Sequence, residues 1–155
     1  MSKIISLNEV KNITPKISAK KTVLVGGCFD LLHYGHLTFL KNAKKTGDFL
    51  IVALESDEFI KEHKDRSSIH NQEQRAEILA SLDFVDLIIK IPLFKSDTEY
   101  SNLVKIIKPK VIAITAGDNQ IDNKKKQANM FGAKLKIVSH LIKGFSSGQI
   151  IKNFE

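Results

Sequence analysis

Residues 23–36 read Val-Leu-Val-Gly-Gly-Cys-Phe-Asp-Leu-Leu-His-Tyr-Gly-His. The aliphatic run 23–25 is typical of a buried strand, and apolar residues over 37–43 recur at helical spacing. The spacing His33-x-Gly-His36 therefore falls where a strand passes into a helix. Backbone N–H groups and the positive end of the helix dipole attract anions there, and histidines add hydrogen bonds or positive charge. The stretch predicts a phosphate-binding turn.

Length and composition favour one soluble domain. The 155 residues can bury a core without disulfides or metals, and the single cysteine, Cys28, excludes an internal disulfide and fits a reducing compartment. No apolar run approaches the ~20 residues of a membrane span, and the first residues lack the apolar block of a signal peptide. We expect a cytoplasmic protein that does not contact a membrane.

The formal net charge of +7 favours anionic partners such as nucleotides, sugar phosphates or nucleic acid. The two arginines, Arg66 and Arg75, lie in one stretch, whereas the lysines are scattered and the run 124–126 is typical of a solvated helix face. Aromatic interleaving, zinc-finger spacing and repeats are absent from the sequence. We therefore expect small phosphorylated ligands, no nucleic acid and no metal site built by the protein.

Strands and helices alternate along the chain, which predicts a single-domain α/β fold with a doubly wound, Rossmann-like, five-stranded parallel sheet. Residues 1–20 are expected to be a helix and linker appended to a domain over 21–155, and 64–72 a mobile loop. The predicted strands cover 22–27, 49–54, 85–91, 111–115 and 134–138. The predicted helices cover 35–46, 56–62, 73–82, 98–107 and 120–131, with a last one from Ser146.

Ligands of a doubly wound sheet bind beyond the carboxyl ends of the strands, where the strand order reverses. The histidine turn, 55–57 and 116–119 each follow a predicted strand. These three segments are expected to converge on one site.

The histidine turn matches neither a P-loop nor a G-x-G-x-x-G fingerprint. Residues 27–36, Gly-Cys-Phe-Asp-Leu-Leu-His-Tyr-Gly-His, instead resemble the G-x-F-D-x-x-H-x-G-H signature of the cytidylyltransferase-like nucleotidyltransferase superfamily. Segments 43–48, 72–75 and 144–148 resemble the end of that family's first helix, an arginine-bearing helix start and a phosphate-binding Ser/Thr turn. The resemblance covers nearly the whole chain.

Within the superfamily, segments 3–11 and 144–152 resemble the adenylyltransferase domains of bacterial bifunctional ADP-heptose synthases. This resemblance implies ATP as co-substrate, D-glycero-β-D-manno-heptose 1-phosphate as acceptor, and a role in lipopolysaccharide biosynthesis. The alternative is a CTP-dependent cytidylyltransferase for glycerol 3-phosphate or a related acceptor. Glycerol-3-phosphate cytidylyltransferases carry an arginine shortly before their Ser/Thr turn, where this chain has Leu141.

The resemblance implies that a phosphate of the acceptor attacks the α-phosphorus of the nucleotide and releases pyrophosphate, without a covalent enzyme intermediate. Alignment and charge stabilisation then supply the catalysis, and Mg²⁺ bridges the phosphates. A homo-oligomer, commonly a dimer, is also implied. The implied catalytic residues are His33, His36, Lys44 and Arg75. The implied nucleotide-binding residues are Gly27, Cys28, Phe29, Asp30, Gly35, Gly117, Asp118, Asn119, Ser146 and Ser147.

Structural explanations exist for the same residues. The histidine pair could be ordinary turn residues or two ligands of an adventitious metal, and Cys28 a small buried side chain. Lys44 could be a solvated lysine at a helix end, and Arg75 could pair with an acidic neighbour on the surface. The serines at 146 and 147 are good helix N-caps in any case.

Two other classes of function stay open. Gly148 stands where many relatives have threonine, and Asp65 where a glycine is expected. These departures favour a nucleotide-sensing module that binds without turnover. Nucleic-acid binding rests on the net charge alone.

Overall fold

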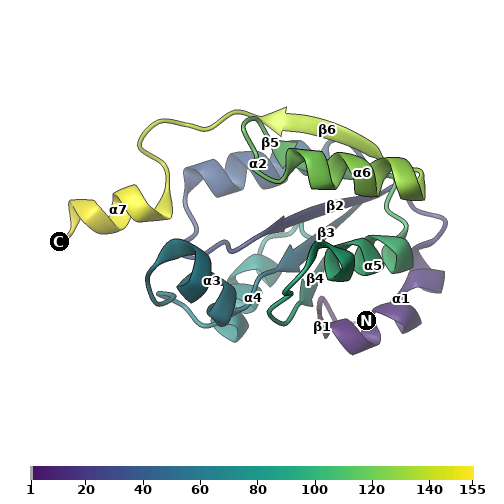
Figure 1. Cartoon of the computed structure of the whole chain (residues 1–155), viewed down its shortest axis with the longest axis horizontal. Helices are drawn as coiled ribbons and strands as arrows, with labels where there is room; N and C mark the ends of the chain where they lie inside the picture. Colours follow the sequence, from purple (N-terminus) through teal and green to yellow (C-terminus); the bar gives the residue numbers. More distant parts are fainter. Residues whose placement is uncertain (1) are drawn as a thin grey trace.

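The sheet has six parallel strands in the spatial order β1-β4-β3-β2-β5-β6, in a computed structural model that describes residues 2–155 (Figure 1). From β2 the chain winds outward through β3 to β4 and, on the other side, through β5 to β6. The predicted doubly wound parallel sheet is thus confirmed, with its order reversing between β2 and β5. The strands are β1 (Ile4–Ser6), β2 (Thr22–Gly27), β3 (Phe49–Leu54), β4 (Leu87–Lys90), β5 (Val111–Thr115) and β6 (Lys134–Ser139).

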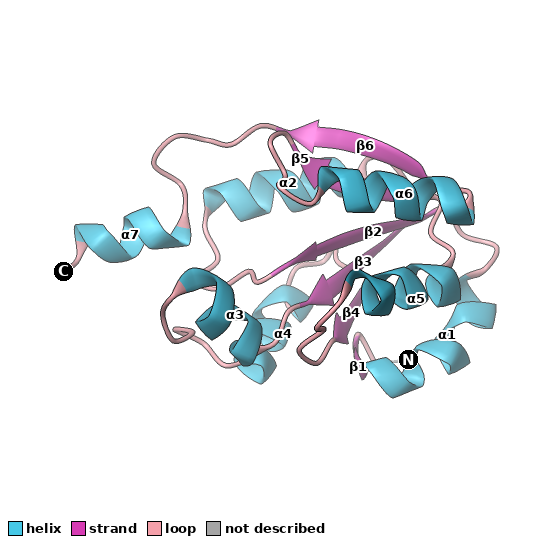
Figure 2. Ribbon diagram, viewed as in Figure 1, coloured by secondary structure: helices cyan, strands magenta, loops and turns pink. Residues whose placement is uncertain are grey.

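Helices cover both faces of the sheet (Figure 2). Apolar side chains of α1, α5 and α6 pack into one buried cluster, and those of α2 and α4 into the other. Among residues 2–155, no helix is long and apolar enough to cross a membrane. The helices are α1 (Val10–Ile17), α2 (Tyr34–Lys44), α3 (Asp57–Lys64), α4 (Gln72–Ala80), α5 (Asp97–Ile107), α6 (Ile121–Phe131) and α7 (Ser147–Asn153), and a 3₁₀ turn spans Leu7–Glu9.

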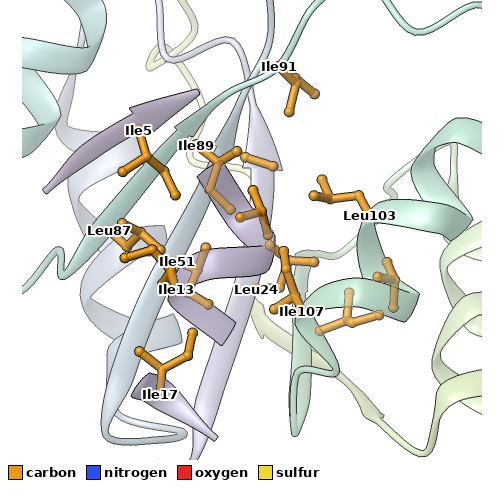
Figure 3. Close-up of a cluster of buried hydrophobic side chains, with 14 of the residues drawn as sticks. Ile5, Ile13, Ile17, Leu24, Ile51, Leu87, Ile89, Ile91, Leu103 and Ile107 are labelled. Carbon is orange, nitrogen blue, oxygen red and sulfur yellow. The ribbon is translucent and has the colours of Figure 1, made fainter. Parts of the chain in front are cut away.

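The expectation of five strands is wrong, because residues 4–6 add β1 at the edge beside β4. Ile5 of this strand is buried, and Val10, Ile13 and Ile17, which recur at helical spacing in α1, belong to the same cluster. Figure 3 shows Ile5, Ile13 and Ile17 in this cluster. A strand of three residues is too short to show an alternating pattern, so its sequence did not reveal it. Residue 1 lies outside the described residues.

The central strand β3 is buried along its whole length, as its continuous apolar run predicts. Strands over 22–27, 49–54 and 111–115 have the predicted bounds, whereas the predicted strand 85–91 shortens to Leu87–Lys90. The carboxyl ends of β2, β3 and β5 lie at one edge of the sheet because these strands are parallel neighbours. The candidate site lies at this edge.

Candidate active site

His33 and His36 cap the start of α2 in a reciprocal arrangement. The His33 Nδ1 atom accepts hydrogen bonds from the N–H groups of Gly35 (3.0 Å) and His36 (3.4 Å), and His36 Nδ1 accepts one from the N–H of His33 (3.3 Å). The two rings stack with centroids 3.7 Å apart. An Nδ1 atom that accepts a hydrogen bond is unprotonated, so this network assigns the proton of each neutral ring to Nε2.

Both imidazoles are neutral at pH 7. Burial, the neighbouring His33 and the charge of Lys64 lower the pKa of His36 to about 3. Burial also lowers the pKa of His33. The sequence predicted that these histidines contribute either hydrogen bonds or positive charge. Because both rings are neutral, they offer hydrogen-bond donors and no positive charge.

Glycine is required in the turn by close packing. A Cβ atom on Gly35 would lie 2.9 Å from His33 Cε1 and 3.1 Å from the backbone oxygen of Phe145, and one on Gly27 would lie 2.9 Å from Phe29 Cε2. Between these glycines the backbone takes the left-handed conformation at Phe29 (φ 47°) and Leu31 (φ 55°). Such strain at non-glycine residues is typical of functional turns.

Asp30 ties the turn to the loop after α3. Its buried carboxylate accepts hydrogen bonds from Arg66 Nη1 (2.7 Å) and from the N–H groups of Ile69 (2.8 Å) and His70 (3.0 Å). Burial opposes ionisation, but these bonds outweigh it and lower the pKa of Asp30. Asp65, which precedes Arg66 in the chain, adopts a left-handed backbone conformation (φ 52°). Glycine adopts this conformation more easily, which fits the glycine expected at this position from the family resemblance.

A cleft of ≈ 170 Å³ opens at the point where the strand order reverses. Its walls come from the end of β2, the first turns of α2, the end of β5 and the start of α6. Burial raises the pKa of Cys28 in this lining, which keeps its thiol protonated. The lining residues are Gly26, Gly27, Cys28, Phe29, His36, Phe39, Ala113, Ile114, Thr115, Asp118 and Lys124.

The turn after β5 supplies the far wall of the cleft. Gly117 is left-handed (φ 80°), and Asp118 accepts hydrogen bonds from the N–H of Gln120 (2.7 Å) and from Lys124 Nζ (2.6 Å). Asn119 is exposed on the same turn. The structure thus brings the predicted segments after β2 and β5 together.

Lys44 lies elsewhere. Its Nζ donates hydrogen bonds to the backbone oxygen of Asp48 (2.7 Å) and to Asp86 Oδ2 (2.5 Å), and Asp86 also accepts the N–H of Leu50 at the start of β3. Because α2 runs away from the histidine turn at about 1.5 Å per residue, its last residue lies near the amino ends of the strands. The structure does not bring Lys44 to the histidines, and this corrects the expectation that it reaches the triphosphate.

Arg75 is fully buried beneath the turn, so the expectation that it holds phosphate also needs correction. Its guanidinium donates to the backbone oxygens of Cys28 (2.7 Å) and Glu55 (2.8 Å). It also donates to the backbone oxygen of His70 (3.0 Å) and to Asp57 Oδ1 (2.6 Å). Arg75 thus joins the carboxyl ends of β2 and β3 as a positioning residue.

The two serines of the last segment have separate contacts. Ser146 is the N-cap of α7 and accepts the N–H of Gln149 (3.1 Å), whereas the Ser147 hydroxyl donates to the backbone oxygen of Asp30. The Phe145 ring packs near that of Tyr34, with centroids 5.7 Å apart. This segment therefore meets the histidine turn directly.

Several residues at the site were missed by sequence reasoning. Lys64 is close enough to lower the pKa values of His36 and Cys28, and Arg66 holds Asp30. Lys124 reaches the cleft from one turn inside α6. The sequence offered one signal for each: Lys64 and Arg66 lie in the segment that follows β3, and Lys124 follows Asp118. Basic residues are too common in this chain for these positions to single them out.

Comparisons with known proteins identify the family of the chain. The model of the Cytidylyltransferase-like family matches residues 24–153. The chain belongs to this family. Its curated relatives include the Bifunctional protein HldE of Campylobacter fetus subsp. fetus, 38% identical over 99% of this chain and 31% of that protein. HldE of Aliarcobacter butzleri is 36% identical over the same shares.

This cytidylyltransferase-like chain spans about a third of the length of those curated relatives. The predicted resemblance to bifunctional ADP-heptose synthases is confirmed, and nucleotidyltransferase is the enzyme class that family and relatives support.

Solved structures share the fold. The lipopolysaccharide core biosynthesis protein from Thermoplasma volcanium matches with a TM-score of 0.63 and 26% identity, over 81% of this chain and 98% of that chain. Pantoate-beta-alanine ligase from Francisella tularensis matches with a TM-score of 0.70 and 20% identity, over 99% of this chain and 73% of that chain.

Proposed function

We propose that this chain transfers AMP from ATP to a phosphorylated sugar, heptose 1-phosphate, and releases pyrophosphate. The observation that carries the proposal is the stacked pair His33–His36, which retains both Nε2–H groups as donors, with His36 in the wall of the cleft between β2 and β5. The resemblance to bifunctional ADP-heptose synthases favours adenylyl transfer and a heptose acceptor, and the similarity to a lipopolysaccharide core biosynthesis protein favours a role in lipopolysaccharide biosynthesis.

In the proposed reaction an oxygen of the acceptor phosphate attacks the α-phosphorus of ATP. The bond between that phosphorus and the oxygen that bridges it to the β-phosphorus breaks, and pyrophosphate leaves with this oxygen. The acceptor phosphate is ionised at neutral pH, so the attack needs no general base. Neutral Nε2–H donors of His33 and His36 stabilise charge on the phosphoryl oxygens. Gly117–Asn119 take the base or ribose, and the turn at Ser146 and Ser147, beside the histidines, takes the β- and γ-phosphates.

Magnesium would be carried by the nucleotide. Residues 2–155 contain no cluster of three His, Cys, Asp or Glu side chains that could hold a metal ion. The carboxylates of Asp30 and Asp118 already accept hydrogen bonds within the protein. Mg²⁺ usually keeps waters and binds substrate phosphates, where it neutralises their charge. The side chains described above therefore fit a Mg²⁺ ion bound mainly by the nucleotide phosphates better than one held by protein ligands alone.

The test is pyrophosphate release with ATP or CTP against heptose 1-phosphate and glycerol 3-phosphate. ATP with Mg²⁺ should raise the melting temperature more than CTP, because ligand binding stabilises the folded state by mass action. A preference for CTP with glycerol 3-phosphate would establish the cytidylyltransferase alternative. Binding of nucleotide without pyrophosphate from any acceptor would establish a sensing module instead.

A further inference from the structure

Glu55 is a buried carboxylate at the edge of the sheet where the candidate site lies. It directly follows β3 and is only 6% exposed. Its Oε1 atom accepts a hydrogen bond of 2.7 Å from the hydroxyl of Tyr100 on α5. Its Oε2 atom is buried and has no hydrogen-bond partner among residues 2–155. Native structures satisfy nearly all buried polar atoms, so this one calls for a function or a bound water.

Glu55 lies beside the cleft lining, since its N–H donates a hydrogen bond of 3.0 Å to the backbone oxygen of Gly27, a lining residue. Cys28 and Lys124 line the cleft, and both lie close to Glu55: the charge of Glu55 raises the pKa of Cys28, and the charge of Lys124 lowers the pKa of Glu55. Burial raises the pKa of Glu55, against the lowering effects of the Tyr100 bond and of His63, Lys124 and Arg75. Arg75 does not neutralise the carboxylate directly, since its contact with Glu55 is to the backbone oxygen.

The position of Glu55 along this edge of the sheet suits binding of the acceptor rather than of the nucleotide. The nucleotide is assigned to the β5 side of the cleft, and its phosphates to the histidine turn after β2. An attacking phosphate must approach the α-phosphorus from the side opposite the leaving pyrophosphate. The neighbouring strand end on the remaining side of β2 is that of β3, where Glu55 lies.

We propose that Glu55 selects the acceptor, with its Oε2 atom accepting a hydrogen bond from a hydroxyl group of a polyhydroxylated phosphate ester. Tyr100 is then a positioning residue that fixes the carboxyl through Oε1. Because Oε2 is enclosed, the hydroxyl reaches it only when side chains around it move aside. This inference rests on the proposed transferase function and names the chemistry by which that site discriminates acceptors.

The test compares two acceptors in the pyrophosphate assay, heptose 1-phosphate and ethyl phosphate, which has no alcohol hydroxyl group. In Glu55→Gln, which keeps the shape and removes the charge, the preference for the sugar phosphate in kcat/KM should fall by roughly 10- to 100-fold. The KM for ATP should not change. Glu77→Gln, the same change on the exposed side of α4, should leave the preference intact. Tyr100→Phe should raise the KM for the sugar phosphate more than it lowers kcat.

Each other outcome counts against the inference. An unchanged preference in folded Glu55→Gln, or an equal loss with both acceptors and a lower melting temperature, would make Glu55 a structural residue satisfied by water. A wild-type preference for phosphocholine, which carries a trimethylammonium group in place of hydroxyl groups, would reject a hydroxyl-selecting role. If ATP stabilises the wild type but no acceptor yields pyrophosphate, the transferase proposal itself fails. Should Glu55→Gln not fold, the KM measurement on Tyr100→Phe decides.

Discussion

His33 and His36 each accept, through Nδ1, the backbone N–H of the other. This reciprocal pair satisfies N–H groups that every helix start leaves free, and it locks two imidazole rings in a stack with both Nε2–H groups as donors. A single motif therefore builds the start of α2 and presents donors for a phosphate.

Replacing His36 with alanine should reduce kcat by roughly 10²- to 10³-fold, the usual effect of removing one preorganised donor to a developing charge. The KM for ATP should change much less. The measurement is steady-state pyrophosphate release. His140→Ala, an exposed histidine after β6, is the matched control. Near-wild-type kcat in His36→Ala would contradict the proposed mechanism.

Stability should fall on acidification because of His36. Its pKa is 6.5 unperturbed and about 3 in the folded chain, so between these values the unfolded state binds a proton that the folded state does not. The free energy of unfolding therefore rises with pH through this window and levels off above about 6.5. Melting temperatures from pH 5 to 7.5 should show a steeper rise for the wild type than for His36→Asn. Parallel curves would rule out this assignment.

Removing Arg75 should destabilise the chain more than it impairs phosphate binding. Arg75→Met leaves Asp57 and three backbone oxygens without their donor, and breaking a buried charged network costs about 3–5 kcal/mol. Urea unfolding measures this loss. The control is Lys90→Met, which breaks the more exposed pair with Glu73 and should cost about 1 kcal/mol or less. A stable Arg75→Met variant with weakened ATP binding would restore the phosphate-ligand role.

Substitutions of Lys44 and Lys124 should differ in their effect on ATP binding. Lys44→Met breaks a contact near the amino ends of the strands and should leave kcat/KM for ATP within about twofold, with a loss of stability of about 1 kcal/mol or less. Lys124→Met removes a cation from the cleft and should weaken ATP binding. Isothermal calorimetry with ATP distinguishes the two. Equal weakening by both substitutions would place Lys44 back at the site.

Gly35→Ala should disturb the histidine turn, because the added methyl group would overlap the His33 ring and the Phe145 carbonyl. We expect a lower melting temperature and reduced pyrophosphate release. Gly148→Ala lies in α7 with nothing within 4 Å of the added atom, and it should be neutral or stabilising by up to about 1 kcal/mol. Thermal unfolding of the two variants makes the comparison, and equal tolerance would refute the packing argument.

The motif over 27–36 was sufficient to predict the family, and the alternation of strands and helices predicted the parallel sheet, because turn chemistry and periodicity are local properties of the sequence. The buried run over 49–54 likewise predicted a central strand. β1 escaped prediction because a short edge strand is defined by its partner β4 rather than by its own pattern.

The roles of Lys44 and Arg75 could not be predicted from the sequence. They depend on the direction of α2 relative to the cleft and on how deeply the Arg75 side chain is buried. Lys44 follows the histidines by two helical turns or more, and the axis of α2 carries it away from the cleft. Arg75 reads as a surface helix residue, yet the packing of α4 drives its guanidinium beneath Cys28 and Glu55. The local sequence determined the histidine turn of the candidate site, and long-range packing determined which charged side chains lie near it.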